Sequence, residues 1–353
     1  MWFIIAAKLS AEEFGGLNYE ISLATLLTSV GIMGFDTTLT SFLAKGVTKM
    51  LAESIFLILV ASAIVSIILL FVYPSIAVIL LIVSMLFFTL TEAKNLGDQN
   101  FKKYMWLMIV QRFITLFFVP IFYFLFGFEA AIYGFTLSYF LTSYEIFKRL
   151  GSIKISISTL IPIKNYFFHS YILGVSKTLP YFFDKLLILP LFGLSIVGYY
   201  QFGVQILAIV SIFPIIFYGY LLPRESQKRD TISFDKYARI GLISSSLLSF
   251  LLILCIPFLI DLLFPKFLLA TFSAQIILLA GIPLTMSSIY NSIFMSRDLS
   301  WNVVIGSIIF IGIQSLGIVT LGSIYGLIGL SISTTVAATL QCIYLMIIKR
   351  RLH

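Results

Sequence analysis

Three ionisable side chains interrupt the otherwise apolar segment "VSKTLPYFFDKLLILP", which covers residues 175–190. They are Lys177, Asp184 and Lys185. A charge at the centre of a membrane span costs about 2.5–3.5 kcal/mol on insertion scales, so it normally faces a partner or a water-filled cavity. Asp184 follows Lys177 by seven residues, which places both on one helical face. We expect Lys185, nearer the exterior end, to reach the lipid headgroups with its long stem.

Two more charges, Arg112 and Asp36, lie inside other apolar stretches, both toward their cytoplasmic ends. One interpretation pairs Arg112 with Asp36 and Lys177 with Asp184 as structural ion pairs. The other places Arg112 and Lys177 in a cationic cavity, where arginine grips phosphate oxygens in a fork and lysine acts as a point charge. Both interpretations stay open, because a pair that faces a wet cavity can open to a ligand.

Carboxylates inside spans suggest a second chemistry, coupling to H⁺ or Na⁺. Asp36, Asp184 and Glu20 are the candidates, although Glu20 stands near an exterior end and could simply be solvated. A further set of amide side chains could bind sugar hydroxyls or hold helices together. This set comprises Gln111, Gln201, Gln205 and Asn291, with Asn18, Gln275 and Gln314 as further members.

The composition requires an integral membrane protein. The 353 residues are 60% hydrophobic and only 11% charged, with a mean hydropathy of +1.08, whereas soluble domains average about 25% charged residues. Apolar stretches long enough to cross a bilayer recur along the chain, and each should be a helix because lipid leaves no backbone group unsatisfied. We predict an all-α polytopic fold with eleven full spans, near residues 17–43, 52–73, 75–92, 104–127, 129–147, 167–190, 195–222, 238–264, 268–295, 301–321 and 324–348.

Before these spans stands "MWFIIAAK", which is too short to cross; we expect it to be the remainder of a truncated first helix or an interfacial start. The basic residues predict orientation, because loops on the cytoplasmic side retain lysine and arginine. One set of alternate loops holds 18 of the 23 basic residues, including Lys154, Lys228, Arg229 and the final Lys349, Arg350 and Arg351. The C-terminus is therefore predicted to be cytoplasmic, and the net charge of +8 reflects topology rather than nucleic-acid binding.

The longest early polar break, residues 148–166, divides the spans into two sets. We predict an N-terminal helix bundle at 1–150 and a C-terminal six-helix bundle at 151–353. An internal repeat supports this division: aligning Gly15 with Gly198 brings Asn18 onto Gln201, and "IYG" at 132–134 matches "IYG" at 324–326. Parallel repeats that enclose a substrate are a recurrent transporter design.

Enzymatic function is disfavoured by the short exterior connections. No paired nucleophile and base and no phosphate-cradling glycine loop is visible. Two distant cysteines and two histidines suggest neither a disulfide framework nor a metal site. We predict a protein without a cofactor or a bound metal, and we disfavour a membrane glycan polymerase or glycosyltransferase.

Three stretches resemble one family. They are "KLSAEEFGGLNYEISLATLLTSVGIMGFDTTLTSFLAKG" at 8–46, "DKLLILPLFGLSIVGYYQFGVQI" at 184–206, and "PRESQ" with the later ending "IYGLIGLSISTTVAATLQ". In order and spacing they are similar to polysaccharide or O-antigen repeat-unit flippases of the multidrug/oligosaccharidyl-lipid/polysaccharide exporter superfamily. Two features depart from that family, since Ala11 replaces its usual proline and most of the first helix is missing.

The resemblance implies two pseudo-symmetric six-helix bundles around a central cavity in the cell membrane. It implies alternating access that carries a lipid-linked oligosaccharide, a glycan on polyprenyl phosphate or diphosphate, to the outer leaflet for surface-polysaccharide assembly. The partners would then be this substrate, membrane lipids and a coupling H⁺ or Na⁺. The alternative within the superfamily is a cation-coupled multidrug exporter, whose pore should be richer in acidic and aromatic residues than in buried cations.

Overall fold

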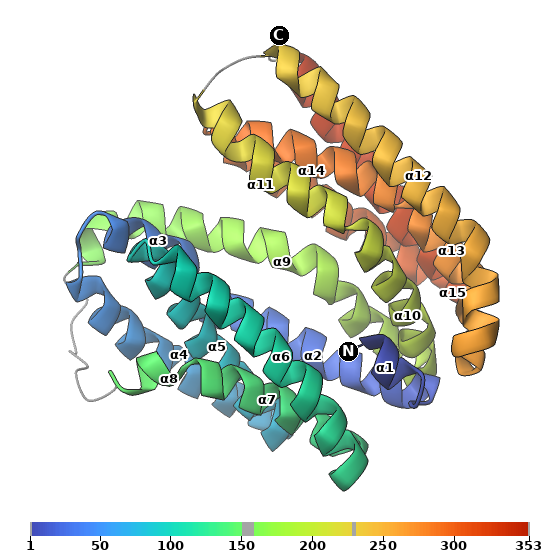
Figure 1. The fold of residues 1–353 in the computed structure, drawn as a ribbon, viewed down its shortest axis with the longest axis horizontal. Helices are drawn as coiled ribbons and strands as arrows, with labels where there is room; N and C mark the ends of the chain where they lie inside the picture. Colours follow the sequence, from blue (N-terminus) through green and yellow to red (C-terminus); the bar gives the residue numbers. More distant parts are fainter. Residues whose placement is uncertain (1, 150–158, 228–230, 352–353) are drawn as a thin grey trace. The chain divides into compact units, whose positions relative to one another are not determined.

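The computed structural model describes residues 2–149, 159–227 and 231–351 and is almost entirely helical, with no strand in these ranges (Figure 1). The predicted all-α polytopic class is confirmed. Lys154, Lys228, Arg229 and the predicted domain boundary between residues 150 and 151 lie outside the described residues.

Contacts divide the chain into two units. Unit 1 contains Glu20–Thr178, and unit 2 contains Trp2–Tyr19 together with Leu179–His353. Two helices, α2 (Ala11–Gly31) and α9 (Lys164–Phe192), therefore contribute residues to both units.

Unit 1 is built on α5 (Ile76–Gly97), against which α3 (Phe35–Ala44) and α7 (Ala131–Thr142) pack. Side-chain caps set where two of its helices begin, because an N-cap oxygen satisfies an otherwise free amide. Ser75 accepts from the Val78 amide at 3.4 Å, and Asn100 accepts from the Lys103 amide at 3.2 Å. The other elements are α4 (Lys49–Val72), α6 (Phe101–Phe126), η1 (Phe128–Ala130), α8 (Tyr144–Phe147) and η3 (Ile161–Ile163).

Unit 2 is built on α14 (Gly281–Ser296), which packs against α11 (Ile212–Gln227), α12 (Thr231–Leu263) and α15 (Ser300–Arg351). Helix α15 covers two predicted spans, because two helices meet at a kink at Gly326, where the backbone is not helical (φ 56°, ψ −131°). The remaining elements are α1 (Trp2–Ala6), α10 (Leu194–Val210), η4 (Pro265–Ala270) and α13 (Thr271–Leu279).

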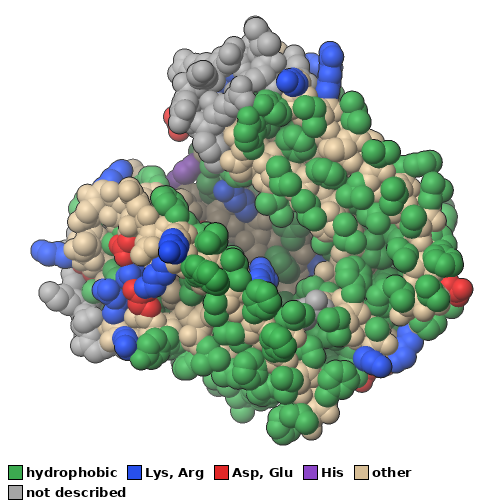
Figure 2. Space-filling view, in the orientation of Figure 1, with side chains coloured by type: hydrophobic (Ala, Val, Ile, Leu, Met, Phe, Trp, Pro, Cys, Tyr) green, Lys and Arg blue, Asp and Glu red, His purple; other side chains and the backbone are tan. Residues whose placement is uncertain are grey.

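Six helices among the described residues are long and apolar enough to cross a membrane, and two bent helix pairs raise this number to eight. The other predicted spans also coincide with helices, but these helices are not among the six to eight candidates. The count of eleven therefore stays a prediction. Apolar side chains that would be buried in a soluble protein are exposed, such as Phe71, Phe250 and Phe258. Hydrophobic side chains cover the visible faces of α6 and α12 (Figure 2), as expected of surfaces that face lipid.

The two repeat glycines meet in unit 2, where α2 crosses α10. A Cβ on Gly15 would lie 2.0 Å from the Leu194 carbonyl oxygen, and a Cβ on Gly198 would lie 1.8 Å from the Ala11 carbonyl oxygen. Only glycine allows two backbones to approach this closely. The helices that begin here are bent in the same way, by 48° between α2 and α3 and by 42° between α10 and α11.

The second repeat match does not align equivalent contacts. Gly134 packs against the backbone of α6, where its Cβ would lie 2.7 Å from the Val119 Cα. Gly326 instead forms the bend of α15 and has no atom within 4 Å of its Cβ position. Gly329 packs against the preceding half of α15, with its Cβ position 1.9 Å from the Leu321 carbonyl oxygen. The two "IYG" glycines therefore have different surroundings, and their equivalence in the repeat stays a prediction.

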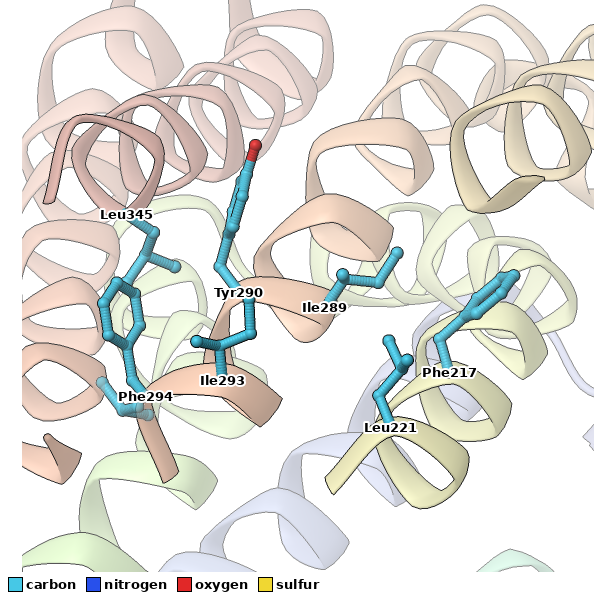
Figure 3. Close-up of a cluster of buried hydrophobic side chains, with 8 residues drawn as sticks. Phe217, Leu221, Ile289, Tyr290, Ile293, Phe294 and Leu345 are labelled. Carbon is cyan, nitrogen blue, oxygen red and sulfur yellow. The ribbon is translucent and has the colours of Figure 1, made fainter. Parts of the chain in front are cut away.

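An apolar cluster fixes α14 between its neighbours in unit 2 (Figure 3). Its members come from α11, α14 and α15 and are Phe217, Leu221, Ile289, Tyr290, Ile293, Phe294, Val303 and Leu345. Because these residues occupy one side of α14, the opposite side is free to present other side chains.

Candidate functional site

Asp184 and Lys185 form a buried ion pair within unit 2. The Lys185 Nζ donates to Asp184 Oδ1 at 2.8 Å and to the Tyr181 carbonyl oxygen at 2.8 Å, and the Lys185 residue is 2% exposed. Two expectations are thereby corrected. Lys185 does not extend toward headgroups, because its ammonium has partners inside the protein, and the ion-pair partner of Asp184 is Lys185 rather than the predicted Lys177.

A hydrogen-bond network continues from this pair to two other helices. The Tyr200 hydroxyl donates to Asp184 Oδ2 at 2.9 Å and lies 2.8 Å from the Thr334 hydroxyl. The Gln314 amide donates to Tyr200 at 3.2 Å and to Thr334 at 3.3 Å. The network links α9, α10 and both halves of α15, so every charge in it is compensated.

Arg112 and Lys177 behave differently in unit 1. Both side chains are exposed, and neither forms an ion pair with a described residue. The predicted direct pair between Arg112 and Asp36 is therefore wrong. Lys177 does lie within reach of the Asp36 charge. Gly174, one turn before it on α9, would place a Cβ 4.0 Å from Asp36 Oδ2.

Glu92 completes this charge group, although the sequence analysis did not single it out. It lies on α5 within reach of the charges of both Arg112 and Asp36. Together with Asp36, Thr40 and Tyr104 it lines a pocket of about 410 Å³. The Asp36 Oδ1 is buried there without a hydrogen-bond partner. Glu92 was overlooked because it stands at the predicted end of its span, where a charge is usually solvated.

Of the four predicted sugar-binding amides, only Asn291 lines the unit 2 cavity described below. Gln111 donates to Thr115 at 3.0 Å and is linked through it to Ser138, so it joins α6 to α7. Gln201 is buried with its Oε1 unpaired, and Gln205 is partly exposed, but neither lines the cavity described below. Glu20 accepts a hydrogen bond from the Tyr73 hydroxyl at 2.9 Å.

Asn291 lines a cavity of about 730 Å³ in unit 2, between α9, α10, α11, α14 and α15. Its walls are mostly apolar, with a set of hydroxyl and amide groups among them. On α14, Leu284, Ser287, Ser288 and Asn291 follow a helical spacing of three and four residues, opposite the apolar cluster. This spacing was available in the sequence, and it is the signal that would have identified Ser287 and Ser288.

Gln341, another cavity residue missed in the sequence analysis, follows Thr334 by seven residues on α15, so both point to one face. Gln341 is 7% exposed and makes no hydrogen bond with any described residue. A polar group in a mostly apolar cavity costs free energy unless water or a ligand satisfies it. The cavity thus holds polar groups that are available to a ligand.

No protein-family model matches the chain, and no curated protein matches its sequence. Solved structures match its fold. One described as the inward-facing conformation of a multidrug resistance MATE family transporter of the MOP superfamily aligns over 99% of this chain and 92% of its own, with a TM-score of 0.78 and 14% identity. The lipid II flippase MurJ, inward closed, aligns over 99% and 87%, with a TM-score of 0.69 and 16% identity.

The chain has the fold of MOP-superfamily transporters. The structure of a Vibrio cholerae MATE transporter VcmN mutant also matches this fold. It aligns over 99% of this chain and 90% of its own, with a TM-score of 0.62 and 12% identity. At these identities the likeness extends to the fold alone. The MOP fold accommodates proteins described as drug transporters and as a lipid flippase, so cargo must be argued from this chain's own side chains.

Proposed function

We propose that the chain is a transporter, without enzymatic activity, that flips a lipid-linked oligosaccharide from the cytoplasmic to the outer leaflet of the cell membrane by alternating access. The cargo would carry a polyprenyl phosphate or diphosphate. The observation that carries the proposal is that Arg112 and Lys177 stand on apolar helices, exposed and without an ion pair among the described residues.

A cation in an apolar span is retained when something compensates it. Asp36 and Glu92 lie within reach of these two cations but do not bind them directly. The cations are therefore partly neutralised while remaining available. A phosphate oxygen can bind Arg112 in a fork and Lys177 through a single contact, while the lipid tail remains in hydrocarbon.

The MOP fold supports this proposal, because one protein with it is described as a lipid II flippase. The cytoplasmic C-terminus predicted from the basic residues would place the longest polar breaks on the side where the cargo is loaded.

Transport in proteoliposomes tests the proposal. The purified chain would be reconstituted with a fluorescent glycan on polyprenyl diphosphate, and a membrane-impermeant quencher would report its movement between leaflets. Arg112→Ala with Lys177→Ala should lower the initial rate at least tenfold, because both phosphate ligands are lost. Arg239→Ala with Lys236→Ala is the matched control, since it removes the same two residue types at exposed positions on α12.

Movement of the glycan at the parental rate by the Arg112/Lys177 variant would reject the phosphate role. A loss of rate in the control variant as well would mean that removing any two cations slows transport. That outcome would also reject a specific phosphate role for Arg112 and Lys177.

A second candidate is a cation-coupled multidrug exporter, and the pocket lined by Asp36 and Glu92 favours it. Two carboxylates in one small pocket can hold an organic cation or a coupling proton. In the same liposomes, export of a fluorescent cation such as ethidium, driven by a pH gradient and abolished by Glu92→Gln, would support the exporter. Glycan movement without cation export would support the flippase.

A further inference from the structure

The unit 2 cavity, lined by Asn291, Gln341, Gln314 and Tyr218 among others, has electrically neutral walls. Asp184 is the one charged side chain among the described residues that line it. Its carboxylate already binds the Lys185 ammonium and the Tyr200 hydroxyl. A ligand entering the cavity would therefore meet hydroxyls, amides and apolar surface, but no uncompensated charge.

The available polar groups point to a ligand that both donates and accepts hydrogen bonds. The Asn291 Oδ1 is buried without a partner and accepts. The Gln341 amide, which has no partner among the described residues, offers a carbonyl acceptor and an amino donor. Sugar hydroxyls supply both functions, whereas a purely apolar ligand would leave these groups unsatisfied.

The apolar share of the walls also limits the ligand. Val204, Leu207, Phe310 and the Tyr218 ring form much of the surface. Ligand pockets generally combine such walls with a few placed polar groups. A carboxylate in this setting would lose its water without gaining a cation, which is far more costly than burying a hydroxyl.

We propose that this cavity binds the glycan part of the cargo and selects uncharged sugars, such as hexoses or N-acetylhexosamines, over sugars that carry a carboxylate. The inference deepens the proposed function and rests on it for the identity of the cargo. It adds a site and a substrate class that the phosphate role of Arg112 and Lys177 does not supply.

Binding of lipid-free trisaccharides tests the cavity independently of transport. Saturation-transfer NMR with the purified full chain in nanodiscs would compare neutral chitotriose with trigalacturonate, an acidic trisaccharide of the same length. Chitotriose should bind at least tenfold more tightly. Asn291→Leu and Gln341→Leu should each weaken chitotriose binding about fivefold to tenfold, the loss expected when one hydrogen bond is removed.

Asn302→Leu is the matched control, because Asn302 lies outside the cavity lining and should leave chitotriose binding unchanged. The gain-of-function variant Asn291→Lys adds an uncompensated cation and should reverse the preference toward trigalacturonate, an outcome that misfolding cannot mimic.

The two proposals can fail separately. Arg112→Ala with Lys177→Ala should bind chitotriose as the parent does, so a transport defect without a binding defect leaves the cavity assignment standing. Equal binding of the two trisaccharides by the parent, or unchanged preference in Asn291→Lys, would overturn it.

Discussion

Unit 1 and unit 2 share a helix plan, but the charges inside their apolar helices are compensated in opposite ways. Each has a bent helix pair, α2 with α3 and α10 with α11. In each, the second helix of the pair packs on a later helix, α3 on α5 and α11 on α14. In unit 2, Asp184 and Lys185 neutralise each other at 2.8 Å. In unit 1, Arg112 and Lys177 remain exposed and without an ion pair among the described residues.

The difference separates charges that hold the structure from charges that are free to bind. An internally compensated pair has no capacity left for a ligand, whereas a cation with acids nearby but not in contact keeps that capacity. Stability should therefore depend on the unit 2 charges, and transport on those of unit 1.

The largest effect is expected for Asp184→Ala. Removing one member of a buried ion pair leaves an uncompensated charge, which costs about 3–5 kcal/mol in soluble proteins. The Lys185 ammonium would be left with the Tyr181 carbonyl oxygen alone. The folded yield and the melting temperature in detergent should both fall sharply.

The double variant Asp184→Asn with Lys185→Met is the informative control, because it removes both charges together. It should recover most of the lost stability. If the double variant were as unstable as Asp184→Ala, the uncompensated charge would not be the cause of the lost stability.

A smaller loss is expected from Gly15→Ala or Gly198→Ala at the crossing of α2 and α10. Each new methyl group would meet a carbonyl oxygen at 2.0 Å or 1.8 Å, and overpacking of this kind typically costs about 1–3 kcal/mol. Since the two contacts are nearly symmetric, the two variants should melt at similar temperatures. Gly312→Ala should be neutral or stabilising, because no atom lies within 4 Å of its Cβ position. Equal melting of all three variants would show that the crossing tolerates displacement.

Much of this architecture could be predicted from the sequence. Apolar length and the need for internal backbone hydrogen bonds predict the helices, and the aligned glycines Gly15 and Gly198 make reciprocal close contacts. Gly134 and Gly326 have different surroundings, because identical letters do not guarantee identical contacts, so this part of the repeat stays a prediction.

The charge partners were harder to predict. Helical spacing predicts one face for residues 177 and 184, but the Lys185 side chain turns back and pairs with its neighbour Asp184. Spacing within one helix also cannot reveal that Glu92 on α5 lies near Asp36 on α3 and Arg112 on α6, because that proximity arises from packing.

Stability should respond only weakly to Lys177→Ala or Arg112→Ala. Substitutions at exposed positions without specific contacts usually change stability by about 0.5 kcal/mol or less. Melting in detergent should therefore stay close to that of the parent, while glycan movement falls as proposed above. A large fall in the melting temperature of either variant would mean that this cation stabilises the fold. The two units would then not differ in the role of their charges.

A similarly small effect is expected for Lys103→Ala, which tests whether unit 1 also contains charges that stabilise the fold. Lys103 binds Glu145 at 2.5 Å, but its side chain is 50% exposed, and exposed pairs contribute about 0–1 kcal/mol. Lys94 binds the same carboxylate at 2.6 Å with a side chain only 7% exposed, so Lys94→Ala should lower stability more than Lys103→Ala.

Melting temperatures measured in low and high salt separate the two variants. Added salt screens the exposed contact, so it should abolish the Lys103 effect while leaving most of the Lys94 effect. Equal losses at both salt concentrations would mean that burial does not decide which charges stabilise this unit.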